Sequence, residues 1–166
     1  MGAGKTTVGR ILASHLGWEF EDLDDRIIAR EKRTISEIFE RSGEQAFRRA
    51  EHEALQACLA EWSSRDVPKI LALGGGAFVQ PENEALLAAS SVPTAFLDAP
   101  VEELWRRCSQ EGCARPLLRD MDRFRALYQL RRPYYLRASL RVETAGKAVE
   151  TIAVELVRRL HLRPRA

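Results

Sequence analysis

Apolar residues recur along the chain with the spacing of amphipathic helices separated by short buried strands. From Val8 to Leu16 they lie on one helix face, and Gly17 ends that predicted helix. The same reasoning predicts further helices over 24–31, through 39–42, after Gly43, around 83–89, from 100 to about 108, from about 121 to Pro133, and from 149 to 160. Short apolar stretches predict strands over 18–21, 69–73, 94–97 and 140–143. Alternating strands and helices are typical of an α/β domain with a parallel sheet and helices on both faces.

Two segments between these elements need separate comment. Thr34 or Ser36 could cap the helix that follows them, since both side chains can accept a backbone hydrogen bond. Residues 109–120 show no apolar period, and we expect a mobile loop there. The length of 166 residues is enough for one core and too short for two, so we expect one domain over 1–166.

Composition excludes several classes of protein. Lysine and arginine total 26 against 24 acidic residues, a balance that argues against a general nucleic-acid binder. The three cysteines suggest neither a disulfide framework nor a zinc site, and reduced thiols are expected. No apolar run approaches the roughly 20 residues of a membrane span. We therefore expect a cytoplasmic protein that binds no membrane.

A phosphate-binding motif opens the first predicted helix. Gly2-Ala3-Gly4-Lys5-Thr6-Thr7 matches the second half of the P-loop pattern G-x-x-x-x-G-K-[ST]. Glycines let backbone N–H groups surround phosphate oxygens, and the N-terminus of the helix adds a favourable dipole. Lys5 would neutralise the β and γ phosphates, and the Thr6 hydroxyl would bind Mg²⁺.

The first glycine of that pattern would fall before Met1, together with the strand that normally launches the loop. A lost strand of about five residues would remove several buried side chains at ~1.5–3 kcal/mol each. It would also leave ladder hydrogen bonds unpaired on its neighbours. We therefore expect that a longer natural chain carries this strand, and that the chain without it is unstable and of doubtful activity. The codons upstream of Met1 test this expectation.

Two acidic residues follow the first predicted strand. Asp22 and Asp24 would lie on the same side of an extended stretch. One could hold Mg²⁺ through water, and the other could accept a proton from a substrate hydroxyl. A solvated acidic turn that caps a helix is the alternative interpretation.

Two arginines are placed to bind an anionic substrate. Arg48 and Glu51 are three residues apart on a predicted helix, so the carboxylate can orient a guanidinium that suits a bidentate carboxylate ligand. Arg131 lies on the apolar face of its own helix, where a charge needs a partner or a ligand. A surface salt bridge is the alternative for Arg48.

Two further segments could approach a ligand. Gly74-Gly75-Gly76 follows a buried strand, where bare backbone allows close approach to a ligand or a sharp turn without one. Arg115 lies in the loop over 109–120, where it could close over a transferring phosphoryl group. An ordinary surface arginine is the alternative for Arg115.

Taken together, these segments resemble the shikimate kinases over nearly the whole chain. The motifs occur in order with matching spacing: the P-loop half over 2–7, the D-x-D pair over 22–24, F-R-x-x-E over 47–51, the glycines over 74–76, R-P-L over 115–117 and R-x-P-x-Y over 131–135. The resemblance implies a P-loop kinase-type three-layer α/β/α fold whose first, central strand is missing from this chain. It also implies a mobile lid at about 109–120.

The resemblance further implies phosphorylation of the shikimate 3-hydroxyl by MgATP in a monomer. Asp24 would bind that hydroxyl and act as the base, Arg48 and Arg131 would hold the shikimate carboxylate, and Gly75 would offer backbone to a ring hydroxyl. Thr6 would ligate Mg²⁺, with Asp22 reaching it through water. Arg115 would be the lid arginine, and Arg107 and Lys147 fall on the adenine side.

Two other functions stay open at this point. A kinase for another small sugar acid or nucleotide would share the loop and need a different acceptor pocket. A non-catalytic nucleotide-binding module is the alternative from a different class.

Overall fold

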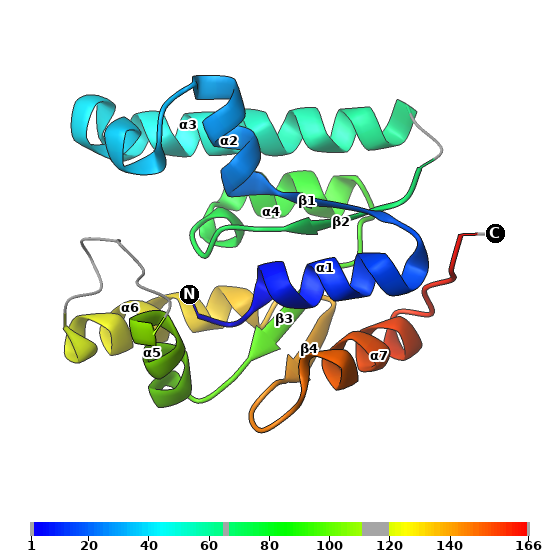
Figure 1. The fold of residues 1–166 in the computed structure, drawn as a ribbon. Coiled ribbons are helices and arrows are strands. Elements are labelled where there is room, and N and C mark those ends of the chain that lie inside the picture. Colours follow the sequence, from blue (N-terminus) through cyan, green and yellow to red (C-terminus); the bar gives the residue numbers. More distant parts are fainter. Residues whose placement is uncertain (1, 65–66, 111–119, 166) are drawn as a thin grey trace. The chain divides into compact units, whose positions relative to one another are not determined.

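The structure, a computed structural model, describes residues 2–64, 67–110 and 120–165 (Figure 1). They separate into two compact units. The first unit comprises the chain up to Leu12 together with Pro93–Arg163, and the second comprises Ala13–Val92 with the last residues from Pro164. The expected single domain over 1–166 stays a prediction.

The second unit is built on two parallel strands. β1 (Glu19–Asp22) pairs with β2 (Lys69–Ala72), with Glu19 opposite Lys69 and Asp22 opposite Ala72. Because the strands are parallel and end at the same level, the residues that follow them emerge at one edge of the sheet. Those residues are Leu23 and Asp24 after β1, and the glycines over 74–76 after β2.

Helices cover these strands and form the core of the second unit with them (Figure 1). They are α2 (Leu23–Glu31), α3 (Ile35–Ser64), the short 3₁₀ helix η1 (Ala77–Val79) and α4 (Pro81–Ala89). The core contains Leu23 and Ile27 of α2 and Ala54, Leu55 and Cys58 of α3, each fully buried. Burial raises the pKa of the Cys58 thiol to about 12, so this cysteine is chemically inert.

The first unit has a second pair of parallel strands. β3 (Ala95–Asp98) pairs with β4 (Leu140–Glu143), and α1 (Lys5–Leu16) begins in this unit. The other helices are α5 (Val101–Gln110), α6 (Met121–Tyr135) and α7 (Val149–Arg159). Leu104 and Cys108 of α5 pack with Phe124 and Tyr128 of α6, and the ring of Trp105 lies edge-on to Phe124.

The helices and strands lie where the hydrophobic pattern predicts them, with boundaries shifted by a few residues. The α/β class with parallel strands is therefore confirmed. In the described residues the strands form two sheets of two strands each.

The predicted break at Gly43 is confirmed: within α3 this residue is non-helical, with φ 79° and ψ 173°, and two helical segments meet there at a kink. Glycine adopts this conformation without a Cβ penalty. One predicted boundary is wrong. Pro133 does not stop α6, which continues to Tyr135. In the last turn proline removes a single intrahelical hydrogen bond, and the Leu136 amide still donates to the Arg132 carbonyl.

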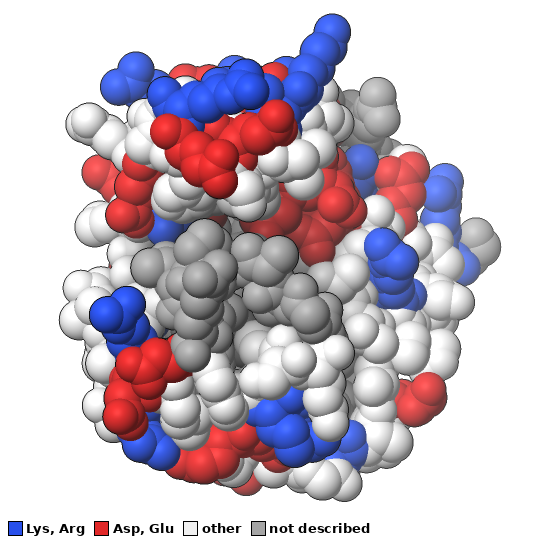
Figure 2. Space-filling model, turned by 60° about the vertical axis from the view of Figure 1, so that its left-hand side comes forward, with Lys and Arg blue, Asp and Glu red and all other residues white. Residues whose placement is uncertain are grey.

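Charged side chains of both signs are interspersed on the face in Figure 2. Over the part of the chain that the structure describes, no helix is both long enough and apolar enough to cross a bilayer.

Candidate active site

The half P-loop adopts the backbone geometry of an anion cradle. Gly2 and Gly4 both have left-handed backbones, with φ of 59° and 73°, and α1 begins at Lys5 directly after them. The Val8 amide donates to the Gly4 carbonyl at 2.9 Å, which closes the first turn of the helix. When right-handed and left-handed backbone conformations alternate, successive N–H groups point to the same side. The N-terminus of the helix adds its dipole there.

Gly2 is required by space as well as by its backbone angle. A Cβ there would collide with the Leu104 carbonyl oxygen and lie 2.9 Å from the Cys108 sulfur. Around Gly4 a Cβ would meet nothing within 4 Å, so only its φ demands glycine. The loop is therefore seated against α5 through Gly2. Ala3, Lys5 and Thr6 are half-buried, and Thr7 is exposed.

Asp22, the last residue of β1, and Asp24 take different positions. They do not share an extended stretch as predicted, because the chain turns into α2 between them. Asp22 is the N-cap of α2, and its Oδ1 accepts from the Asp24 amide at 3.0 Å. Asp24 lies in the first turn of the helix, so the alternative interpretation of a capping turn holds for Asp22 and not for Asp24.

The Arg48 guanidinium rests on the glycine turn. Its Nη1 donates to Glu51 Oε2 at 2.8 Å, and its Nη2 pairs with Glu44 at 3.2 Å. A Cβ on Gly76 would lie 2.7 Å from Nη2, so the guanidinium occupies the space that any other residue at 76 would fill. Burial opposes the charged form of Arg48, but Glu51 and Glu44 together outweigh burial and raise the pKa of Arg48 above its ordinary value.

The side chains of Asp24 and Glu51 lie against the glycine turn as well. A Cβ on Gly74 would be 2.9 Å from Asp24 Oδ1 and 3.4 Å from Glu51 Oε1. Glu51 is a fully buried carboxylate, with 1% of its surface exposed, and such a group needs the compensation that Arg48 provides. The second unit thus brings Asp24, Arg48 and the segment around Gly75 together, as the sequence predicts.

Arg131 lies in α6, in the first unit. It is half-buried, and the buried side chains of the same helix are Phe124 and Tyr128, so its assigned role stays a prediction. Its neighbour Arg132 forms an ion pair with Asp98 at 2.9 Å.

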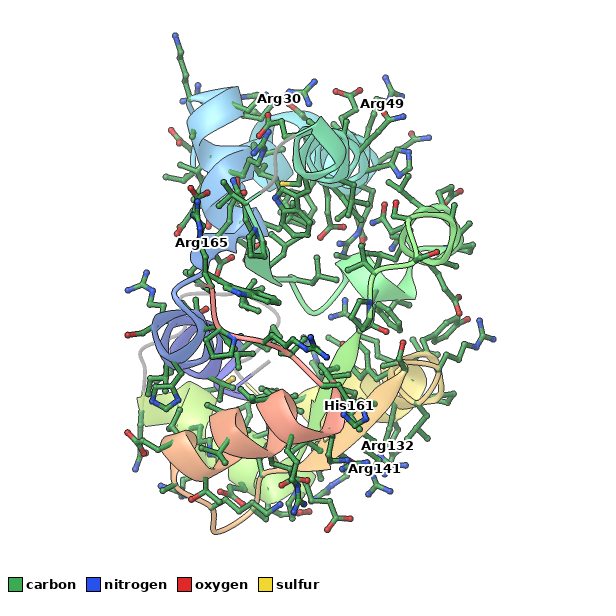
Figure 3. All side chains as sticks on the ribbon, turned by 90° about the vertical axis from the view of Figure 1, so that its right-hand side faces the viewer. Arg30, Arg49, Arg132, Arg141, His161 and Arg165 are labelled. Carbon is green, nitrogen blue, oxygen red and sulfur yellow. The ribbon has the colours of Figure 1, made fainter. Side chains whose placement is uncertain are left out.

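The Asp98 cluster is the main feature of the first unit that sequence reasoning missed. Asp98 is 5% exposed, and it accepts hydrogen bonds from the Tyr128 hydroxyl at 2.6 Å, from Arg132 at 2.9 Å and from Arg141 Nε at 2.8 Å. Figure 3 shows Arg132 and Arg141 side by side. Burial alone would raise the pKa of Asp98, but these three donors outweigh it and lower the pKa. Asp98 is the last residue of β3. The hydrophobic pattern of that strand gives no sign of side-chain partners that lie 30 or more positions away in the sequence.

The residues predicted for the adenine side each have an acidic partner. Arg107 pairs with Glu103 one turn earlier in α5, and Lys147 Nζ lies 2.7 Å from Glu155 Oε2. The Lys147 hydrogen bond lowers the pKa of Glu155. Arg115 and residues 111–119 of the predicted lid lie outside the described residues, so these assignments stay predictions.

A metal ion would have to be held by few protein oxygens. Among the residues that the structure describes, no group of three His, Cys, Asp or Glu side chains could bind a metal. This fits Mg²⁺ in a phosphoryl-transfer site, because Mg²⁺ keeps most of its waters and takes only one or two protein ligands besides the phosphates. The Thr6 hydroxyl and the Asp22 carboxylate are hard oxygen donors of the kind that Mg²⁺ prefers.

Comparison with known proteins gives a consistent result. The family model described as shikimate kinase matches residues 1–161. The shikimate kinase of Geobacter metallireducens is 42% identical, over 94% of this chain and 85% of the relative. The shikimate kinase from Acinetobacter baumannii, solved in complex with shikimate, has a TM-score of 0.83 at 36% identity and covers 97% of this chain and 88% of that chain. The enzyme from Bacteroides thetaiotaomicron has a TM-score of 0.84 at 29% identity, covering 98% of this chain and 94% of that one.

Proposed function

The chain belongs to the shikimate kinase family, and from that premise we propose that it transfers the γ-phosphoryl group of ATP to the 3-hydroxyl of shikimate. One observation in the second unit carries the assignment: the Arg48 guanidinium, oriented by the buried Glu51, lies on the bare backbone of Gly76, and Asp24 lies against Gly74 of the same glycine turn. A cation fixed next to a carboxylate suits an acceptor that has both a carboxylate and hydroxyl groups.

On the acceptor side, we assign the shikimate carboxylate to Arg48 and Arg131. A guanidinium that already has a buried acidic partner is held in one orientation, which lowers the ordering cost of binding. Gly75 is buried between the two close-packed glycines, so its backbone can approach a ring hydroxyl. Asp24 accepts the hydrogen bond of the reacting hydroxyl and takes its proton.

On the nucleotide side, the loop over 2–7 binds the phosphates of ATP. The left-handed glycines and the first turn of α1 supply N–H donors, and Lys5 neutralises the β and γ phosphates. Arg115 stabilises the transferring group, and Arg107 and Lys147 lie against the adenine. Both charged groups are paired with acidic residues of their own unit. We therefore propose that these ion pairs hold the two side chains in place, and that their aliphatic parts contact the adenine.

We assign Mg²⁺ to Thr6 directly and to Asp22 through water. When bound, the ion neutralises charge on the β and γ phosphates. Asp22 keeps one oxygen on the Asp24 amide, so its position is fixed by the cap of α2. The same cap places Asp24 at the start of the helix, and the two acidic residues are thereby positioned by one local structure.

Catalysis then consists of positioning and charge neutralisation. Asp24 orients the acceptor hydroxyl for in-line attack, and Lys5 and Arg115 stabilise the charge that spreads over the transferring oxygens. No covalent intermediate on the protein is needed.

We propose that the protein acts as a cytoplasmic monomer on small molecules alone, with no nucleic-acid or membrane partner. Cys58 is a buried free thiol, as expected in a reducing compartment. The nearly balanced charge offers no basic stripe for nucleic acid.

A panel of acceptors in a coupled assay of ADP release tests this function. The full chain is incubated with MgATP and, separately, with shikimate, other hydroxylated ring acids, sugar acids and nucleoside monophosphates. We expect ADP release that depends on shikimate and is far weaker with the others. Release with a different acceptor would identify another kinase, and ATP binding without acceptor-dependent release would indicate a non-catalytic module.

A further inference from the structure

A second polar connection joins α3 to the glycine turn through residues outside the assigned site. His52 Nδ1 lies 2.7 Å from the Oδ1 of Asn83, which is fully buried in the first turn of α4. The Asn83 Nδ2 donates to the Ala77 carbonyl at 3.0 Å. The Ala77 amide in turn donates to the Gly74 carbonyl at 3.1 Å, which closes the turn. His52 is thus linked to the glycine segment through a single buried side chain.

The chemistry of this connection determines which nitrogen of His52 carries a proton. A carbonyl oxygen only accepts, so the side of Asn83 that faces Ala77 must be its NH₂ group. Its Oδ1 therefore faces His52, and Nδ1 of the ring must carry the donated hydrogen. Both the imidazolium and the Nδ1–H tautomer of the neutral ring satisfy this requirement, whereas the Nε2–H tautomer does not.

The connection runs parallel to the contact made by Arg48. Arg48 and His52 are four residues apart on α3 and so share one helix face. Arg48 lies against Gly76, and His52 reaches the next residue, Ala77, through Asn83. A shift of the turn by a few tenths of an ångström would therefore change the place that the guanidinium can occupy.

We propose that His52, acting through Asn83, is a positioning residue of the acceptor site, which sets the distance between α3 and the glycine turn. The proposal rests on the proposed function, because its consequence for activity is a change in shikimate binding. Its consequence for structure, the stability of the turn, does not depend on which acceptor the protein uses.

Two substitutions of nearly equal shape provide the test. His52→Asn places an amide nitrogen close to where Nδ1 lies, and His52→Leu has the same branching without a donor. His52→Leu is expected to raise the KM for shikimate on the order of tenfold, the effect of losing one hydrogen bond of ordinary strength. The KM for ATP should stay within about twofold, and His52→Asn should restore the KM for shikimate. Arg49→Ala, an exposed residue on the outer face of α3 (Figure 3), is the matched control and should change neither.

Amide hydrogen exchange supplies a second readout that needs no activity. In His52→Leu the Ala77 amide should exchange on the order of tenfold faster, with His52→Asn close to the parent chain. Should His52→Leu fail to fold, His52→Gln takes its place, since its donor nitrogen lies one bond farther out and should not restore the contact.

Equal behaviour of the Leu and Asn variants in both readouts would overturn the proposal, as would an equal rise of both KM values. If the parent chain does not use shikimate, the proposed function fails. The exchange rate of Ala77 then still decides whether His52 positions the turn.

Discussion

At the scale of single residues, the acceptor site depends on positions that have no side chain. Gly76 has φ −99° and ψ −19°, a helical conformation open to any residue. Its importance is therefore steric and not conformational: the Arg48 guanidinium occupies the volume of the absent Cβ. Gly4 is the opposite case, with a left-handed backbone and open space around it.

Gly76→Ala should therefore separate binding from stability. The flexible end of Arg48 can move aside, so the free energy of unfolding should fall by no more than about 1 kcal/mol. The KM for shikimate should rise on the order of tenfold or more, because a guanidinium displaced by about 1 Å loses its bidentate geometry. Steady-state kinetics and urea unfolding of the same preparation check this. Gly4→Ala is the contrasting variant and should weaken the binding of ATP instead. An unchanged KM for shikimate in Gly76→Ala would contradict our placement of Arg48.

The same residues show what a sequence can and cannot predict. Arg48 and Glu51 were predictable because their spacing along one helix already sets their faces. Asp24 was predicted on an extended stretch and instead lies in the first turn of α2, because the chain turns directly after β1. Asn83 and Asp98 were not predictable, since each is meaningful only through partners about 30 or more positions away. Periodicity shows that a position is buried, and it does not show which donor will meet it.

At the scale of elements, the start of α3 is held by a reciprocal cap. The Glu37 amide donates to Thr34 Oγ1 at 3.2 Å, and the Thr34 amide donates to Glu37 Oε2 at 2.8 Å. From the sequence, Thr34 and Ser36 were equally good candidates for the N-cap, because either hydroxyl can cap a helix. The backbone of the preceding turn decides between them, and Ser36 is an exposed residue of the first turn.

Thr34→Ala should destabilise the fold by about 0.5–2 kcal/mol, the usual cost of a lost N-cap. Ser36→Ala, two residues further along the chain, is the matched control and should change the unfolding free energy by less than about 0.5 kcal/mol. Thermal unfolding of the three chains measures both effects. A larger loss in Ser36→Ala than in Thr34→Ala would show that the helix begins elsewhere.

Helices, strands and the kink at Gly43 were predictable because the hydrophobic pattern and the conformational freedom of glycine are local. The continuation of α6 through Pro133 was not, because a proline in the last turn removes only one hydrogen bond and need not end the helix. The pairing of β1 with β2 and of β3 with β4 follows from the topology of alternating strands and helices.

At the scale of the whole molecule, the Asp98 cluster links stability to pH. The folded pKa of Asp98 lies below its ordinary value of about 3.9, so the unfolded chain binds a proton first as the pH falls. The stabilisation by this carboxylate is therefore fully present above about pH 4 and is lost as the pH falls toward the folded pKa. Arg132 and Arg141 are partly exposed, so water can solvate them once Asp98 is protonated. This limits how much stability the protein loses at low pH.

Asp98→Asn should lower the free energy of unfolding at neutral pH by about 1–3 kcal/mol, because the donors around it lose a charged acceptor. As the pH falls below about 4, the difference in unfolding free energy between the two chains should narrow. Comparing the two chains cancels the contributions of Glu37 and Glu155, whose pKa values are also lowered. Urea unfolding at a series of pH values measures the gap, and a constant difference would show that Asp98 is not the titrating group.

Phosphorus NMR of the reaction mixture observes the transfer to the 3-hydroxyl of shikimate itself. With MgATP and shikimate, we expect the γ-phosphate signal to disappear and one new phosphomonoester signal, coupled to the ring proton at carbon 3, to appear. Loss of the γ-phosphate without shikimate, an ester at another hydroxyl, or no change at all would show that this chain does not phosphorylate the 3-hydroxyl.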